Sequence, residues 1–378
     1  MFPVFKGSPH EIGVQQGQYY RDPIQEATVR ITKAATFRAA KPWYLPTPLF
    51  YSLAKRRASK LLKEDVYACY PERAEQLEGV AKGAGVDLST LLFFMYLELA
   101  GVGQTRFSVD ACTAIGFQRE ATECGEVIIV KNMDFYNDYA FMLTAMKTVP
   151  NEGYAVFGNT AMSFPGMIDG MNEHGLSVTY NLTKTMEKPT CYTPLSLAIQ
   201  ETLQSCKTAD EAVQHITQAK RGGDALLMIG DAEGTLRAVE LSSAQSAVRK
   251  PQGPVLVNTN HYHTDEMKRV EVPQDAVYPE DAAPEFRNQP VHLNSITRWK
   301  RVNELLAEGG RFSEERIYGI MSDHGSYTEP PRPTICRHHD LISTLYTMVY
   351  YPERRIIKVQ YGNPCMNELS EMVFGETG

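Results

Sequence analysis

A cysteine directly follows a small residue in the stretch VDACTAIGF at residues 109–117. If the peptide bond between Ala111 and Cys112 is cut, Cys112 gains a free α-amine with a pKa of about 7.7–8.0 beside a thiol with a pKa of about 8.5. One residue then holds both nucleophile and base, because the amine can take the thiol proton directly or through one water molecule. Before the cut, the amide nitrogen cannot accept that proton. The stretch therefore predicts a precursor that stays inactive until the bond before Cys112 is cut.

Cys112 also allows two other interpretations. In a conventional Cys/His enzyme the chain stays intact, and His261, His324 or His338 acts as the general base. In a non-catalytic protein of the same fold, a Cys112→Ala variant binds its ligand as well as the parent protein does. A large fragment that begins with Cys112 and Thr113 would distinguish autoprocessing from both interpretations.

Cysteine and histidine spacing does not predict a metal site. The chain has seven cysteines, which are Cys69, Cys112, Cys124, Cys191, Cys206, Cys336 and Cys365. Their odd number and the lack of a CxxC pair argue against a disulfide framework and against structural zinc. His261 and His263 lack a further ligand at a familiar spacing, as does the segment RHHD at residues 337–340. No glycine-rich phosphate loop is found either, so we expect neither a metal nor a cofactor.

Composition limits the possible partners. Of the 378 residues, 43% are hydrophobic and 22% are charged, as in a globular protein. A net charge of −7 and a pI near 5.8 offer no attraction for nucleic acid. The N-terminus has no basic segment followed by an apolar one, and no apolar run is long enough to span a membrane. We expect a cytoplasmic protein with a small-molecule substrate and without nucleic acid or membrane partners.

The elements that must position Cys112 change type along the chain. Residues 1–111 are expected to be helical, with helices at residues 24–40, 47–70, 71–85 and 87–101. Pro71 and Gly85 mark the start and end of one of them, and the run from Leu91 to Leu97, apolar on nearly all sides, predicts a buried helix. From residue 112 the pattern is extended, and residues 112–120 and 126–135 are predicted to form a hairpin.

The rest of the chain alternates between strands and helices. Further strands are predicted at residues 141–149, 154–160, 166–172, 175–182, 225–231, 236–241, 255–260, 344–352 and 355–362. Helices are predicted at residues 193–205, 208–219 and 294–309 and at a short segment after the last of these, and Thr208 and Glu211 have capping-box spacing. Residues 263–290 are expected to form a long surface loop. This order favours a sheet core with helices outside over a doubly wound sheet.

Several short motifs occur in an order that is typical of one enzyme family. They are GSPHEIGVQQG, DACT, NMDF, GMNEHGLSVTYN, NTNH, NSITRWKR, MSDHG and TICRH, and they span nearly the whole chain. In type and order they resemble acyl-coenzyme A:6-aminopenicillanic acid acyltransferases, which are N-terminal nucleophile hydrolases related to choloylglycine hydrolases and penicillin V acylases. The resemblance implies an α+β fold. Residues 112–378 would form a four-layer αββα catalytic core, and residues 1–111 a helical pro-segment or small subunit.

The resemblance also implies roles for individual residues. Cys112 would be the nucleophile, and Ala111–Cys112 would be the cleavage site. Asp134 of the N-x-D motif would orient the freed amine. Asn260 of NTNH would donate to the oxyanion, with Asn181 as a second polar group near it.

An arginine is expected to support the nucleophile electrostatically. The resemblance points to Arg298, and Arg301, one helical turn away, competes for this role. Two residues depart from the family pattern: Ala111 stands where the penicillin acyltransferases have glycine, and Lys131 stands where the choloylglycine branch has arginine. Lysine keeps the charge but cannot make the two-point contact of arginine, so we do not expect Lys131 to recognise a substrate carboxylate as that arginine does. The implied reaction attacks a small N-acyl amide or acyl thioester through a Cys112 thioester and passes the acyl group to water or an amine, with hydrolysis slightly favoured.

Overall fold

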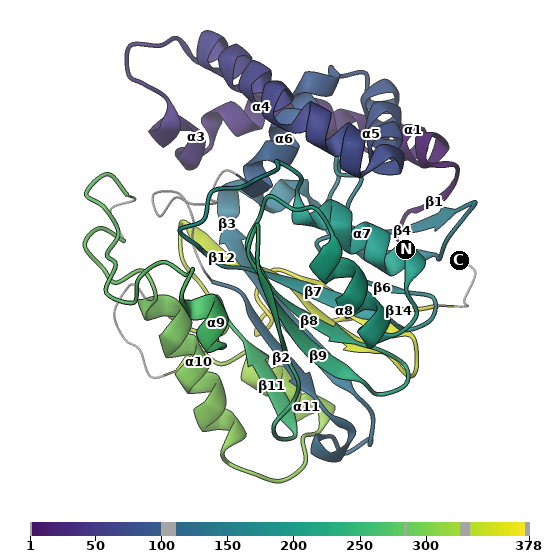
Figure 1. Cartoon of the computed structure of the whole chain (residues 1–378), viewed down its shortest axis with the longest axis vertical. Helices are drawn as coiled ribbons and strands as arrows, with labels where there is room; N and C mark the ends of the chain where they lie inside the picture. Colours follow the sequence, from purple (N-terminus) through teal and green to yellow (C-terminus); the bar gives the residue numbers. More distant parts are fainter. Residues whose placement is uncertain (1, 100–110, 283–285, 326–332, 375–378) are drawn as a thin grey trace.

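Two β-sheets pack face to face in the computed structural model, which describes residues 2–99, 111–282, 286–325 and 333–374 (Figure 1). The eight-stranded sheet contains, in spatial order, β1 (Val4–Gly7), β4 (Leu143–Pro150), β5 (Val156–Ala161), β6 (Asp169–Asn172), β7 (Ser177–Leu182), β8 (Ala225–Gly230), β9 (Leu236–Leu241) and β10 (Ser246–Arg249). The six-stranded sheet contains β11 (Val255–Asn258), β2 (Thr113–Phe117), β3 (Ile128–Tyr136), β12 (Ile342–Tyr351), β13 (Ile356–Tyr361) and β14 (Ser370–Val373). Neighbouring strands are antiparallel except β1 and β4, which are parallel.

Helices cover the outer face of each sheet. The main covering helices are α7 (Leu195–Ser205) and α8 (Ala209–Gln218) on the eight-stranded sheet, and α10 (Leu293–Leu306) and α11 (Glu314–Met321) on the six-stranded sheet. Strand alternation explains the layering: Leu227 of β8 packs in the same cluster as Ile199 of α7, whereas its neighbour Met228 packs between the sheets with Tyr346. Val302 of α10 belongs to a third cluster, on the far side of the six-stranded sheet. The predicted αββα fold class is confirmed.

The N-terminal helices form a cap over one end of the sandwich (Figure 1). They are α1 (Pro9–Tyr19), α2 (Arg21–Arg30), α3 (Ala35–Ala40), α4 (Thr47–Cys69), α5 (Pro71–Ala84) and α6 (Leu88–Leu99). Helices α1 and α5 approach closely at glycines, because a Cβ added to Gly13 would lie 2.0 Å from the carbonyl oxygen of Gln76. The same part of the chain contributes β1, which sequence analysis did not predict and which pairs with β4 from Val4 opposite Lys147.

Most predicted elements appear with small shifts in their ends. The β2–β3 hairpin is confirmed with Thr113 opposite Asn132, and the capping box of Thr208 and Glu211 opens α8. Gly85 ends α5 in the left-handed conformation. The predicted surface loop at residues 263–290 contains a short helix, α9 (Asp265–Lys268).

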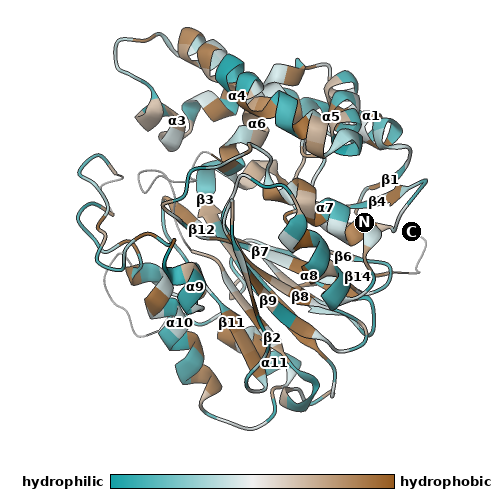
Figure 2. Ribbon diagram, in the orientation of Figure 1, coloured by the Kyte–Doolittle hydropathy of each residue, from teal (hydrophilic) through white to brown (hydrophobic). Residues whose placement is uncertain are grey.

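Hydropathy follows this layering (Figure 2). The strands of both sheets are largely apolar, whereas α4 and α10 alternate between polar and apolar residues. Helix α6 is apolar on nearly all sides and is buried, as predicted. Within the described ranges, no helix combines the length and apolarity needed to cross a bilayer.

Candidate active site

Cys112 lies immediately before β2, a central strand of the six-stranded sheet. Its side chain is 4% exposed, and its Sγ lies 3.4 Å from the Sδ of Met133 and 3.7 Å from the carbonyl oxygen of Asp134. Burial raises the pKa of the thiol to about 11, although the nearby Lys131 opposes this shift. In the uncut chain the thiol is therefore protonated at neutral pH and is a poor nucleophile.

Asp134 lies on β3 beside the predicted cleavage site. Continuing the register of β2 and β3 from the pair Thr113–Asn132 sets Asp134 opposite Ala111. Thr344 donates a hydrogen bond to Oδ1 of Asp134 at 2.6 Å. Oδ2 is buried and has no hydrogen-bond partner among the residues that the structure describes. A new amine at this point of the strand would supply the missing donor.

Arg298 reaches the main chain of Cys112 from helix α10. Its side chain is fully buried and donates to the carbonyl oxygen of Cys112 and, at 2.8 Å, to Oγ1 of Thr113. The other guanidinium nitrogens donate to Oδ1 of Asn260 at 2.6 Å and to Oδ1 of Asn294 at 2.8 Å. A permanent positive charge is thus held against the backbone of the predicted nucleophile.

Arg301, the other arginine considered for this role, binds acidic side chains instead. It makes a two-point ion pair with Asp323, at 2.9 and 2.8 Å, and also contacts Glu304 at 3.3 Å. Its side chain is 30% exposed. The geometry therefore favours Arg298 as the arginine next to Cys112.

Asn181 and Asn260 link β7 of one sheet to β11 of the other and to the residues after it. Nδ2 of Asn181 donates to the carbonyl oxygens of Asn258 and Thr259, at 3.3 and 2.9 Å. Nδ2 of Asn260 donates to the carbonyl oxygen of Leu182 at 2.6 Å. A primary amide carries two N–H donors. Among the described residues, one N–H of Asn260 therefore has no hydrogen-bond acceptor, whereas both donors of Asn181 are used.

A buried ion pair also joins the sheets beside Cys112. Nζ of Lys131 lies 2.7 Å from both carboxylate oxygens of Asp169 on β6, and neither side chain is exposed. The Tyr180 amide and the Tyr346 hydroxyl donate to the same carboxylate. Lys131 is thus held inside the protein and is not available to a substrate carboxylate. Sequence analysis missed Asp169; its only signal was a lone acidic residue in the apolar strand GMIDGMN.

A second residue that sequence analysis did not single out lies near Asp134. Arg337 is 1% exposed, and its Nε and Nη1 have no hydrogen-bond partner within the described part of the chain. Burial lowers the pKa of Arg337, and the charge of Asp134 opposes that shift. The backbone of Arg337 exchanges hydrogen bonds with Thr344, the residue that also binds Asp134. Arg337 and Thr344 therefore complete the polar surroundings of Asp134.

The histidines proposed as alternative bases do not contact the thiol. Among the described residues, none of His261, His324 and His338 forms a hydrogen bond with Sγ of Cys112. Nδ1 of His261 contacts the hydroxyl of Ser295 at 2.8 Å, and burial lowers the pKa of His261 to about 4. The described geometry contains no Cys112–histidine dyad.

The titration of Asp134 should make the stability of the uncut chain depend on pH. Burial raises its pKa from 3.8 to about 6, so between these values the folded state binds more protons than the unfolded state. Stability should therefore fall as pH rises through this window, by up to about 3 kcal/mol. In a Cys112→Ala background, which is expected to remain one chain, an added Asp134→Asn substitution should remove this fall. Urea unfolding from pH 4 to pH 7 measures the free energy of unfolding of both proteins. The same pH dependence in the two proteins would contradict this prediction.

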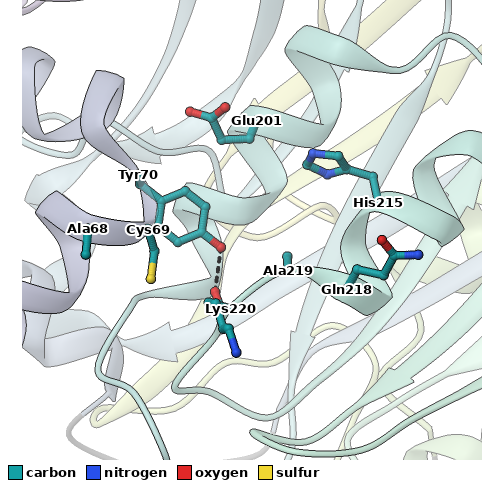
Figure 3. Close-up of a pocket in the computed structure, with 8 residues that line it drawn as sticks. All are labelled: Ala68, Cys69, Tyr70, Glu201, His215, Gln218, Ala219 and Lys220. Carbon is teal, nitrogen blue, oxygen red and sulfur yellow. Dashed lines mark hydrogen bonds between the residues drawn. The ribbon is translucent and has the colours of Figure 1, made fainter.

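A pocket of about 470 Å³ lies away from these residues (Figure 3). It is lined by the junction of α4 and α5 and by α7, α8 and the residues after α8, and the Tyr70 hydroxyl donates to the Lys220 carbonyl across it. Its only histidine, His215, contacts Thr202 through Nδ1 at 2.9 Å. None of the predicted site residues lines this pocket. The pocket therefore does not alter the choice of site.

Comparisons with known proteins give both a family match and similar structures. No curated protein matches the chain. The chain is similar to a Caenorhabditis elegans ortholog of N-acylethanolamine-hydrolyzing acid amidase, at 17% identity and TM-score 0.42, over 64% of this chain and 93% of that one. It is also similar to a mutant conjugated bile acid hydrolase from Clostridium perfringens, at 17% identity and TM-score 0.42, over 70% of this chain and 98% of that one. Penicillin V acylase from Agrobacterium tumefaciens is similar at 17% identity and TM-score 0.44, over 69% of this chain and 86% of that one.

The family match is the stronger finding. The model of acyl-coenzyme A:6-aminopenicillanic acid acyl-transferase matches residues 120–365, which is well over half of the chain. This range begins after Cys112 and contains Asp134, Asn181, Asn260 and Arg298. The chain therefore belongs to the acyl-coenzyme A:6-aminopenicillanic acid acyl-transferase family.

Proposed function

We propose that the protein cuts itself before Cys112 and then acts as an N-terminal cysteine amidohydrolase or acyltransferase. The observation that carries this proposal is Oδ2 of Asp134, which is buried and has no hydrogen-bond partner among the described residues. Continuing the β2–β3 register by two residues beyond Thr113 and Asn132 sets Asp134 opposite Ala111. A buried carboxylate oxygen without a donor is costly, and a freed α-amine of Cys112 would remove that cost. Arg298, held against the Cys112 carbonyl, supports the same assignment.

Cleavage converts one amide bond into a carboxylate and an amine. In this proposal Sγ of Cys112 attacks the carbonyl carbon of Ala111, and the C–N bond breaks while the nitrogen takes the thiol proton. Water then hydrolyses the resulting thioester, which leaves a carboxylate on Ala111 and returns the thiol of Cys112. In this proposal the precursor does not attack other substrates, because its Cys112 thiol is buried and has a raised pKa.

Substrate turnover uses the same atoms in the cut enzyme. The α-amine takes the thiol proton, and the thiolate attacks the carbonyl carbon of an N-acyl amide. The remaining N–H of Asn260 would donate to the oxyanion, a contribution typically worth about 3 kcal/mol. The amine product leaves with the proton, and water or a second amine then takes the acyl group from the Cys112 thioester.

N-terminal sequencing and mass spectrometry of the purified protein test this function. We expect two fragments, residues 1–111 and residues 112–378, with the second beginning Cys-Thr-Ala. Brief incubation with reactive N-acyl amides should add one acyl mass to the larger fragment, and hydroxylamine should remove it. A single intact chain that hydrolyses the same amides would overturn autoprocessing, and two fragments that never carry an acyl group would overturn the thioester.

A further inference from the structure

We propose that His324, Cys336, His338 and Cys365 form a structural zinc site. The four side chains each offer one ligand atom, and these atoms all lie within 4.8 Å of one another. Two cysteines and two histidines are a common structural zinc ligand set. The site is separate from Cys112 and does not depend on the proposed function.

The distances between the ligand atoms suit a tetrahedral ion. Bonds of about 2.3 Å to sulfur and about 2.0–2.1 Å to nitrogen place two sulfurs roughly 3.8 Å apart and a sulfur and a nitrogen roughly 3.5 Å apart. In the structure, Sγ of Cys336 lies 3.7 Å from Sγ of Cys365 and 3.4 Å from Nε2 of His338. Nε2 of His338 lies 3.1 Å from Sγ of Cys365, and the rings of His324 and His338 are 5.1 Å apart. Small side-chain movements would complete the geometry.

Three separate segments supply the four ligands. His324 follows the end of α11, Cys336 and His338 precede β12, and Cys365 follows β13. Cys336 is buried, whereas the other three are exposed, so the ion can enter from solvent. Binding replaces one proton on each thiol, and two thiolates with two neutral imidazoles balance the charge of Zn²⁺.

The site would fix a segment that also contacts the candidate active site. Asn132, two residues before Asp134, donates to the carbonyl oxygens of Met321 and Ile335, both at 2.9 Å. Ile335 and Arg337 flank Cys336 in the chain, and the Arg337 backbone binds Thr344. An ion that ties these segments together would hold the residues that surround Asp134, so its main role is structural.

Metal titration of the full-length protein tests the site. After purification in metal-free buffer, we expect one equivalent of Zn²⁺ per chain, measured by elemental analysis, and a higher midpoint of thermal unfolding with Zn²⁺ than without it. Co²⁺ in place of Zn²⁺ should give the absorption bands of tetrahedral thiolate coordination. Cys365→Ser and His338→Asn should each weaken binding by at least about 100-fold, because each removes one of four ligand bonds. Cys124→Ser, at an exposed cysteine outside the cluster, is the matched control and should bind as the parent does.

Three results would overturn the proposal. The first is the absence of stoichiometric metal in the parent protein, and the second is equal metal affinity in the parent and the Cys365→Ser variant. The third is a disulfide between Cys336 and Cys365, detected as a mass loss of about two hydrogens without reductant. If the variants do not fold, the Co²⁺ spectrum of the parent decides, because a spectrum without thiolate bands excludes the two cysteines as ligands. None of these readouts depends on cleavage before Cys112 or on amide hydrolysis.

Discussion

Replacing Cys112 with alanine is expected to leave the chain as one 42.4 kDa polypeptide and to abolish release of amine from N-acyl amides. In the proposed mechanism both effects have one cause, because the same sulfur would attack the Ala111 carbonyl in the precursor and the substrate carbonyl in the mature enzyme. Loss of a nucleophile typically lowers kcat by about 10³-fold or more. A denaturing gel and an amine-release assay on the same preparation measure both effects.

Two further variants make this result specific. Cys124→Ala changes an exposed free cysteine and should cut and turn over as the parent does. Cys112→Ser keeps a nucleophilic atom and should cut more slowly, because a hydroxyl is harder to deprotonate than a thiol. If Cys112→Ala still released amine at the parent rate, another residue would be the nucleophile. If the parent released no amine from any amide and Cys112→Ala bound ligand as well as the parent, the protein would be a binding member of the fold.

Replacing Arg298 with alanine should damage both stability and catalysis. The substitution leaves the carbonyl oxygen of Cys112, the Thr113 hydroxyl and Oδ1 of Asn260 without their buried donor. Leaving buried acceptors unpaired should lower the free energy of unfolding by roughly 3 kcal/mol. The lost positive charge and misplaced Asn260 should also lower kcat by about 100-fold. Urea unfolding and steady-state kinetics measure the two effects.

Arg301→Ala is the matched control for Arg298→Ala. It removes an arginine three residues along the same helix whose ion pairs with Asp323 and Glu304 are partly exposed, so it should cost less than about 1 kcal/mol and leave kcat unchanged. Arg298→Lys keeps the charge but not the several directed N–H groups, and it should lie between the parent and Arg298→Ala. Equal effects of the two alanine variants would contradict the role assigned to Arg298.

The sequence predicted the core of the fold because burial and strand pairing leave local patterns. The start of β3 and nearly all of β8 are apolar runs, and the capping box of α8 is visible in four residues. The missed strands β1, β10 and β14 are four residues long and at least partly exposed, so their alternation is too short to stand out. They form through hydrogen bonds to distant strands, and a local pattern does not record such pairing.

The sequence predicts which residues belong to the candidate site better than it predicts which atoms they contact. Cys112 and Asp134 belong to motifs that the sequence displays, but the choice between Arg298 and Arg301 depends on which side of α10 meets the sheet. The partner of Lys131, Asp169, lies on the other sheet, and only the packing of the two sheets brings these residues together. The four residues of the proposed zinc site were not recognised in the sequence for the same reason, because His324 and Cys365 are far apart in the chain.

The parallel pairing of β1 with β4 has a consequence for an enzyme cut after Ala111. The short fragment would keep a strand inserted in a sheet built by the long fragment, from Val4 opposite Lys147 to Gly7 opposite Pro150. Cleavage would thus yield two polypeptides that stay associated, and the N-terminal fragment would not be released. Once such a pair is unfolded, refolding requires the two fragments to associate and therefore depends on their concentration. The mature enzyme would thus persist because it unfolds slowly rather than because it refolds reversibly.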